Sequence, residues 1–270
     1  MHKPLRTLVN AAVLSAIAST AYAGGFSLYT ESGPMMTGNF GAGAAAEGAD
    51  ASIGWYNPAG LVLIHNQQAV FGGVGVLPVA QISGTSSYFS PLFDDTPYVE
   101  TFNGLKGAKE AFVPSLHYAL PLGDRATFGF SIVSPFGLAT EWAADSAVRY
   151  QATFTEVITM NFSPEIGGKL TDNFAVGAGL DLQYARVKFN RMLGLPVFAL
   201  PLGNPMVVDS LSYNKGDSFG VGFHAGILGM FNDNHTRIGL NYQSKMRHKF
   251  NGYSQLSGSL AGTVNLGTFP

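Results

Sequence analysis

The chain has 270 residues, of which 46% are hydrophobic and only 12% are charged; the formal net charge is −2 and there is no cysteine. Soluble domains carry about 25% charged residues, so this composition suits a water-exposed surface poorly. The nearly neutral charge argues against a nucleic-acid partner, and the lack of cysteine excludes a disulfide framework, thiolate metal sites and cysteine nucleophiles.

The first 23 residues have the pattern of a secretory leader. Lys3 and Arg6 precede a short apolar run at 8–18, and Ala-Tyr-Ala at 21–23 is a small-x-small cleavage site. This run is shorter than the ~20 residues of a membrane-spanning helix, and no later apolar run reaches that length. The sequence therefore predicts a signal peptide over 1–23 and an exported chain that enters a membrane, if at all, through strands.

Residues 24–66 do not have a strand pattern. They are rich in glycine, contain a block of small residues at 42–46 and include the turn signal Asn-Pro-Ala-Gly at 57–60. We expect an irregular N-terminal subdomain over 24–66, with one short helix near 44–51.

From residue 67 onward, strand-length blocks alternate with turn signals. Strands are predicted at 67–82, 112–120, 126–136, 153–169, 174–191, 218–231 and 236–250, with an eighth beginning near 258. In the strand 174–191, one face carries the apolar residues Phe174, Val176, Ala178, Leu180, Leu182 and Tyr184. The opposite face carries Gly177, Gly179, Asp181 and Gln183, a polar surface that suits a barrel lumen, whereas the apolar face suits lipid.

Short connections alternate with long ones. The short turns lie at 121–125, 170–173 and 231–235, and the long loops lie at 83–111, 137–152 and 192–217. A secreted sandwich or adhesin would explain the alternation, but its strands would be near the globular mode of about 5–6 residues. The sequence thus predicts an all-β fold, an antiparallel transmembrane β-barrel over 67–270 in a bacterial outer membrane.

Several segments, in order along the chain, resemble the FadL/TodX-type outer-membrane transporters of long-chain fatty acids and other hydrophobic compounds. They are Gly25-Phe26, Asn57-Pro58-Ala59, the segments 136–141 and 184–191, and the segment 239–245. Members of this family close a barrel of about fourteen strands around a plug, whereas this sequence supplies about eight. The chain also ends at 267–270 without the usual terminal aromatic strand. We therefore expect a C-terminally truncated piece that forms an incomplete, open barrel.

The resemblance assigns roles to three places. Asn57, Pro58 and Ala59 match the motif of the plug, called the hatch, and would hold it against the wall. Phe26 lies in the N-terminal segment that lines the inner ligand site in the family. Phe136 and Gly137 match the point where the wall is kinked, which would let a ligand leave sideways into the bilayer. The alternatives are a surface turn, a core aromatic residue and an ordinary strand end.

Arg191 is the candidate partner for a ligand carboxylate. By parity it shares the inward face of Asp181 and Gln183, and the corresponding family position helps to bind the fatty-acid carboxylate. The alternative is a loop-end arginine that contacts a neighbouring acid or water. Arg186 and Lys188 have the outward parity and are expected to reach toward lipid headgroups.

The predicted outer loop after Arg191 contains an apolar stretch. Its members are Leu193, Leu195, Val197, Phe198, Leu200 and Leu202. Exposed apolar patches commonly mark binding sites, so we expect a capture groove here. The alternative is a loop that packs on its own barrel.

No enzyme pattern is present. There is no Gly-x-Ser-x-Gly elbow, the histidines lack ligand spacing, and the glycine pattern at 220–225 lies within a strand rather than before a helix. We expect a monomer without cofactor that transports a long-chain fatty acid or another hydrophobic small molecule passively and contacts outer-membrane lipid and lipopolysaccharide. The alternatives are a structural or adhesive protein without a small ligand and a general porin for polar solutes.

Overall fold

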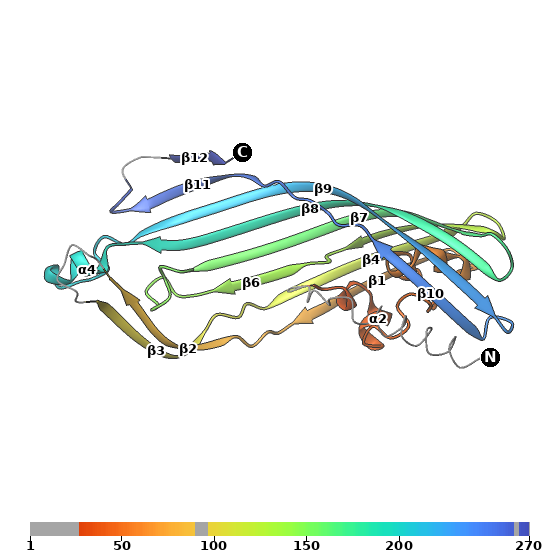
Figure 1. The fold of residues 1–270 in the computed structure, drawn as a ribbon, viewed down its shortest axis with the longest axis horizontal. Coiled ribbons are helices and arrows are strands. Elements are labelled where there is room, and N and C mark those ends of the chain that lie inside the picture. The colour runs from red at the N-terminus through yellow and green to blue at the C-terminus, as the bar shows by residue number, and fades with distance from the viewer. Residues whose placement is uncertain (1–26, 90–96, 262–264, 270) are drawn as a thin grey trace, which may run out of the picture.

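The computed structural model describes residues 27–89, 97–261 and 265–269 (Figure 1). The strands are β1 Gln68–Val76, β2 Gln81–Tyr88, β3 Tyr98–Lys106, β4 Ala111–Pro121, β5 Ala126–Val133, β6 Gly137–Glu141, β7 Phe154–Lys169, β8 Phe174–Leu193, β9 Ser210–Phe231, β10 Thr236–Gln243, β11 Asn251–Gly258 and β12 Asn265–Phe269. The helical elements are η1 Thr30–Ser32, α2 Pro34–Gly38, α3 Ile53–Tyr56, η2 Pro58–Leu63, α4 Pro196–Ala199 and η3 Leu200–Leu202. No helix in these described ranges is long and apolar enough to cross a membrane.

One antiparallel sheet dominates the fold and curls along its length (Figure 1). Its hydrogen-bonded path runs β1-β4-β5-β7-β8-β9-β11-β12, while β6 also pairs with β7, β10 also pairs with β9, and β2 and β3 form a separate hairpin. Within the described residues, β1 and β12 are the two edges of the path, so the sheet is an open, curled half-barrel. This confirms the predicted fold class, and the path has about as many strands as the sequence indicated.

The two faces of the sheet have opposite chemistry. On β8, Asp181 and Gln183 are 4% and 5% exposed and face inward, whereas the preceding residue Leu180 is 44% exposed and faces outward. Large apolar side chains on the outer face include Phe174, Val176, Phe219, Val221, Phe223, Ile227, Ile238 and Leu240. Polar side chains buried on the inner face include Ser131, Asn161, Ser163, Glu165, Ser218 and His224. The predicted orientation of the two faces is confirmed, and it is the arrangement of a sheet with lipid outside.

The N-terminal segment 27–66, called the hatch below, packs on the concave inner face. Its buried core includes Tyr56 and Leu61, which lie against the wall strands. Two inward glycines on the wall permit this close packing, since a Cβ on Gly167 would lie 2.4 Å from the Pro58 oxygen and one on Gly177 would lie 2.3 Å from the Ala59 nitrogen. The small inward residues of β7 and β8 are thus fitted to the hatch.

The predicted helix near 44–51 is wrong. Residues 41–46 form consecutive turns, and the helices lie on either side, at α2 and α3. Just before the predicted segment, Phe40, Gly41 and Gly43 have φ values of 54°, 77° and 75°, in the left-handed region, so α2 cannot continue through 40–43 as a right-handed helix. Pro34 instead starts a helix earlier, at the position where its missing N–H costs nothing.

Two predicted strands are also interrupted. The strand predicted at 67–82 breaks after Val76, and the loop predicted at 83–111 contains most of the β2–β3 hairpin. The strand predicted at 236–250 ends at Gln243, and the ladder with β9 resumes only at Asn251. Charged residues at 245, 247 and 249 still alternate with less polar ones through 244–250, although strand pairing stops there. The sequence periodicity alone therefore could not reveal the interruption.

The two ends of the sheet carry different kinds of connection. The short turns after β4, β7 and β9 lie at the end near the hatch, whereas α4 and the β2–β3 hairpin lie at the opposite end (Figure 1). In the turn after β9, Asn232, Asp233 and Asn234 all have positive φ values of 52–69°. Asn and Asp tolerate this conformation best among non-glycine residues, which explains how so short a turn reverses the chain.

Candidate functional site

The barrel wall is open between β4 and β6. β4 pairs with β5 only from Leu116 to Pro121, and β6 pairs with β7. Among the described residues, the part of β4 at 111–115 has a partner on the β1 side alone. Contact across the opening resumes at the bridge between Ala108 and Thr140, where the Glu141 N–H also donates to the Gly107 oxygen at 3.0 Å. The opening begins where the sequence predicted the kink, at Phe136 and Gly137.

The chain is held in an irregular path at this opening. Pro135 has no N–H to give to a ladder. The Thr159 hydroxyl on β7 accepts a hydrogen bond from the Phe136 N–H at 2.9 Å and lies 2.9 Å from the Phe136 oxygen, to which it can donate. The Thr159 side chain therefore binds the Phe136 N–H in place of a backbone acceptor, while the Phe136 oxygen still accepts from the Thr159 N–H at 3.2 Å.

The start of the hatch covers the same place. Ser27 forms an isolated antiparallel bridge with Phe136, and the Leu28 N–H donates to the Pro135 oxygen at 2.8 Å. The N-terminal segment thus acts as a short added strand on the irregular backbone. Phe26, predicted to line the ligand site, lies outside the described residues.

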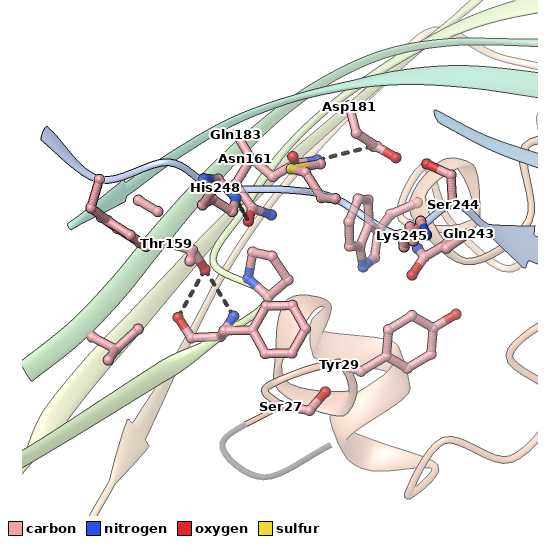
Figure 2. Close-up of a pocket in the computed structure, with 17 residues that line it drawn as sticks. Ser27, Tyr29, Thr159, Asn161, Asp181, Gln183, Gln243, Ser244, Lys245 and His248 are labelled. Atoms are coloured by element: carbon pink, nitrogen blue, oxygen red, sulfur yellow. Dashed lines mark hydrogen bonds between the residues drawn. The ribbon is translucent and has the colours of Figure 1, made fainter. Parts of the chain in front are cut away.

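An inner cavity of about 480 Å³ lies between the hatch and the wall (Figure 2). Its apolar lining includes Trp55, Phe136, Ala185, Met246 and Phe250. Its polar lining includes Asp181, Gln183, Lys245 and His248. Such a cavity, apolar with a few placed polar groups, has the character of a small-molecule site.

A second cavity, of about 510 Å³, lies at the opening in the wall. Its lining combines the buried inward residue Val113 with the outward residues Phe112 and Ile158, which are 71% and 42% exposed. It therefore reaches from the inner face of the wall to the outer face. Phe136 and Val157 line both cavities, so the two are separated only by a shared set of side chains.

A buried polar cluster lies beside the inner cavity. The Asp181 carboxylate accepts hydrogen bonds from Ser163 Oγ at 2.7 Å and Asn161 Nδ2 at 3.0 Å, and His224 Nδ1 lies 3.0 Å from it. His224 Nε2 lies 3.8 Å from Glu165 and 3.3 Å from the Gly54 oxygen of the hatch. His224 is therefore placed between two carboxylates. This cluster was not predicted from the sequence, although the inward parity of its members on adjacent strands was the available signal.

The Asn57-Pro58-Ala59 motif is fully buried between the hatch and the wall. The Asn57 side-chain amide donates to the Ala45 oxygen and to the Ile227 oxygen of β9, while its Oδ1 accepts from the Ala59 N–H at 3.1 Å. Asn57 therefore links two parts of the hatch to the wall, which supports the role expected for the motif.

Arg191 does not reach either cavity. It lies near the end of β8, paired in register with Ser212, and its side chain is exposed. Its inward parity is as predicted, but the inner cavity lies along the strand nearer Asp181. Arg186 and Lys188 face outward and bind neighbouring carboxylates, Arg186 to Asp217 at 3.1 Å and Lys188 to Glu156 at 2.9 Å.

The predicted capture loop is partly folded on itself. It contains α4 and η3, and Val197 is buried, whereas Leu195 and Leu202 are 46% and 71% exposed. Leu193 ends β8 half-buried; the side chains of Phe198 and Leu200 lie outside the described part of the chain. A groove formed by this loop remains a prediction.

Arg149 links the outer loops to one another, a role that was not predicted from the sequence. Its buried guanidinium contacts Glu100 of the β2–β3 hairpin at 2.7 Å and Asp209 before β9 at 3.1 Å. Burial alone would lower the pKa of Arg149, but hydrogen bonds with Tyr98, Glu100 and Tyr150 raise it above its ordinary value. The charged guanidinium is thus the fixed centre of three loops.

Comparison with known proteins agrees with this architecture. Residues 14–268 match the family described as outer membrane protein transport protein (OMPP1/FadL/TodX). The long-chain fatty acid transport protein of Salmonella typhi is 31% identical over 262 residues, which cover 93% of this chain and 57% of that protein. The chain thus spans little more than half the length of this curated relative.

Two solved structures share the fold. A Pseudomonas aeruginosa FadL homologue has a TM-score of 0.65 at 24% identity and is matched over 82% of this chain and 53% of its own. The Ralstonia pickettii toluene transporter TbuX has a TM-score of 0.58 at 21% identity, over 86% of this chain and 62% of its own. Family members are transporters rather than enzymes, and their names place them in the outer membrane, as predicted here. The chain therefore belongs to the OMPP1/FadL/TodX family of outer-membrane transport proteins.

Proposed function

We propose that this chain takes up long-chain fatty acids or other hydrophobic compounds passively, through the inner cavity and then sideways through the opening between β4 and β6. The observation that carries the proposal is the position of Phe136, which lines both cavities and is bridged by Ser27. A ligand in the inner cavity needs only a shift of these side chains and of the N-terminal segment to reach the opening. The names of relatives, long-chain fatty acid and toluene transporters, indicate the class of compound.

The apolar surfaces fit such a route. An apolar ligand that enters the bilayer through the wall avoids crossing the polar lumen below, where His224, Asp181 and Glu165 lie. No energy source is required, because transfer of apolar surface from water into hydrocarbon is favourable by about 25 cal/mol per Å². The exposed end of the 193–202 loop would make the first contact with the ligand.

In the proposed function, the outer face of the sheet contacts the membrane lipid. Phe219, Val221 and Phe223 face outward and are 51–62% exposed, and the Arg186–Asp217 pair lies beyond them along the strands. We expect the apolar residues to contact lipid and the charged ones to contact lipopolysaccharide headgroups, with the protein acting as a monomer. An apolar belt that ends in charged side chains is the usual outline of a membrane boundary.

A reversible cross-link tests the route. Facing residues in an antiparallel pair are 4.5–5.5 Å apart between Cα atoms, within the range of a disulfide, so Ser27→Cys with Phe136→Cys would fix the N-terminal segment on the opening. The chain has no native cysteine to interfere. We expect uptake of a labelled long-chain fatty acid by cells expressing the protein to fall when the pair is oxidised and to recover on reduction.

The control is the other isolated bridge, Ala108→Cys with Thr140→Cys, which fixes the far edge of the opening and leaves the N-terminal segment free. It should leave uptake nearly unchanged. Uptake that persists with the Ser27–Phe136 link formed would contradict lateral release. A structural or adhesive protein would show no uptake in any of these states.

A further inference from the structure

The outward side chains of β7, β8 and β9 change from apolar to charged toward the end of the strands that leads to α4 (Figure 1). Directly paired residues of neighbouring strands face the same side, so strand register arranges these side chains in rows across the sheet. From the middle of the strands toward this end, the rows are Phe162, Leu182 and Val221; Met160, Tyr184 and Phe219; Ile158, Arg186 and Asp217; and Glu156, Lys188 and Lys215. The first charged row therefore lies about 7 Å beyond the last uncharged one.

The two charged rows lie at the level of lipid headgroups. Tyr184 precedes them along β8, and beside Lys215 the rings of Tyr213 and Tyr253 stack with centroids 5.8 Å apart. Tyrosine is enriched where a membrane meets water. The short turns lie at the opposite end of the sheet, and in outer-membrane barrels the end with the long loops faces outward. The charged rows thus mark the boundary of the outer leaflet.

Two lysines are opposed within the outermost row. Lys188 and Lys215 are directly paired in the β8–β9 ladder, and their side chains are only 25% and 27% exposed. Like charges at such paired positions, where the Cβ atoms are about 4.5–5.5 Å apart, destabilise a sheet. Lys188 Nζ lies 2.9 Å from Glu156 Oε1. Lys215 Nζ lies 3.5 Å from Asp217 Oδ2. An anion that contacts both ammonium groups would offset the repulsion between them.

The charges in these rows do not cancel. Asp217 is shared, because Arg186 Nε lies 3.1 Å from one of its oxygens while Lys215 contacts the other. Beside the rows, Lys109 has its own carboxylate partner in Glu141 and adds no net charge. The rows therefore combine three cations with two carboxylates, namely Arg186, Lys188, Lys215, Glu156 and Asp217.

We propose that Arg186, Lys188 and Lys215 form a site for one phosphate group of lipopolysaccharide, called the phosphate site below. Phosphate oxygens are strong acceptors for ammonium and guanidinium groups. A lipid fits better than free phosphate, because its acyl chains can lie over Phe219 and Val221, which are 62% and 58% exposed. The inference rests on the membrane position of the outer face in the proposed function, and it deepens that contact by naming its place and its chemistry.

Three lipids test the phosphate site by titration of the purified full chain in detergent. They are lipid A, which is the phosphorylated acyl-sugar anchor of lipopolysaccharide, the same lipid A without its phosphates, and phosphatidylglycerol. A phosphate monoester carries close to two negative charges near neutral pH, whereas the diester of phosphatidylglycerol carries one. Wild type should therefore bind phosphorylated lipid A about tenfold or more tightly than either of the other two lipids.

The double variant Lys188→Gln with Lys215→Gln should weaken the binding of phosphorylated lipid A by roughly 10- to 30-fold, since each cation near an anionic lipid contributes about a factor of five. Its affinity for the dephosphorylated lipid should stay within about twofold. The matched control is Arg125→Gln with Lys169→Gln, which removes the same charge near the short turns at the hatch end. This control should change neither affinity. Added lipid A should also raise the unfolding temperature of wild type more than that of the double variant.

Several results would overturn the phosphate site. They are wild-type affinity for lipid A in the double variant, an equal loss in the control variant, and equal binding of the dephosphorylated lipid. Phosphatidylglycerol binding as tight as that of lipid A would overturn the assignment to lipopolysaccharide. The double variant should still take up labelled fatty acid at nearly the wild-type rate. Failure of the phosphate site therefore leaves the lateral route standing, and uptake that persists with the Ser27–Phe136 link formed contradicts that route alone.

Discussion

The side-chain amide of Asn57 in the hatch donates a hydrogen bond of 3.0 Å to the backbone oxygen of Ile227 in β9, 170 residues away along the chain. The same amide reaches the Ala45 oxygen, and its own oxygen caps η2 at the Ala59 N–H. A single buried side chain thus joins the hatch to itself and to the wall.

Asn57→Ala should therefore destabilise the protein. It removes the donor to the carbonyl oxygens of Ala45 and Ile227 and the acceptor that caps η2, at a cost of about 2–4 kcal/mol, measured as the free energy of unfolding in detergent. Asn57→Asp keeps the size and the cap but brings a carboxylate against the same two oxygens. We expect it to be at least as unstable as Asn57→Ala, and a near-wild-type aspartate variant would argue against the hydrogen-bond account.

Gly54→Ala should strain the contact between hatch and wall. A Cβ there would lie 1.9 Å from Glu165 Oε2, and the Glu165 side chain is completely buried with little room to move. We expect a loss of about 1–3 kcal/mol, although alanine normally favours a helix. Gly38→Ala is the control, because nothing lies within 4 Å of its Cβ and it ends another short helix. Similar effects at both positions would remove the steric explanation.

The effects of His224, Asp181 and Glu165 on the folding free energy should depend on one another. His224→Ala leaves Asp181 and Glu165 buried without the group between them, which should cost about 3–5 kcal/mol of folding free energy. Neutralising both acids in that background, with Asp181→Asn and Glu165→Gln, should restore most of this loss. If the triple variant unfolds as readily as the single one, repulsion between the carboxylates is not the cause.

Arg149→Met should loosen the outer loops without unfolding the barrel. Glu100 and Asp209 would lose their common partner, so we expect protease cleavage within 142–153 and 194–209 to be about tenfold faster or more, since breaking a buried ion pair costs several kcal/mol. Lys109→Met breaks the exposed pair with Glu141 and serves as the comparison, with an expected change of about 0–1 kcal/mol. Unchanged cleavage in the Arg149 variant would show that the loops hold together by other contacts.

The residues of the site that could be predicted were those placed by the alternation of strand residues between the two faces of the sheet. Asp181 and Gln183 were placed on the inner face because successive strand residues alternate between faces, and both line the inner cavity. The same rule put Arg191 inward but could not give its position along the barrel relative to the hatch. The rule did not identify Lys245 as a residue of the cavity lining. The segment that carries Lys245 has the alternating sequence of a strand but lies outside the strand ladder.

The amino-acid order alone was sufficient for the antiparallel strands and the two faces of the sheet, because these depend on local periodicity and turn residues. The irregular wall near Phe136 was expected mainly from the resemblance to a known family, and the export leader predicted at 1–23 lies outside the described residues. Tertiary structure decided how His224, Asp181 and Glu165 meet, how Asn57 reaches Ile227, and how 244–250 enters the lumen over Gly220 and Gly222. Those contacts join residues far apart in the chain, and strand register and backbone approach, rather than any local pattern, determine them.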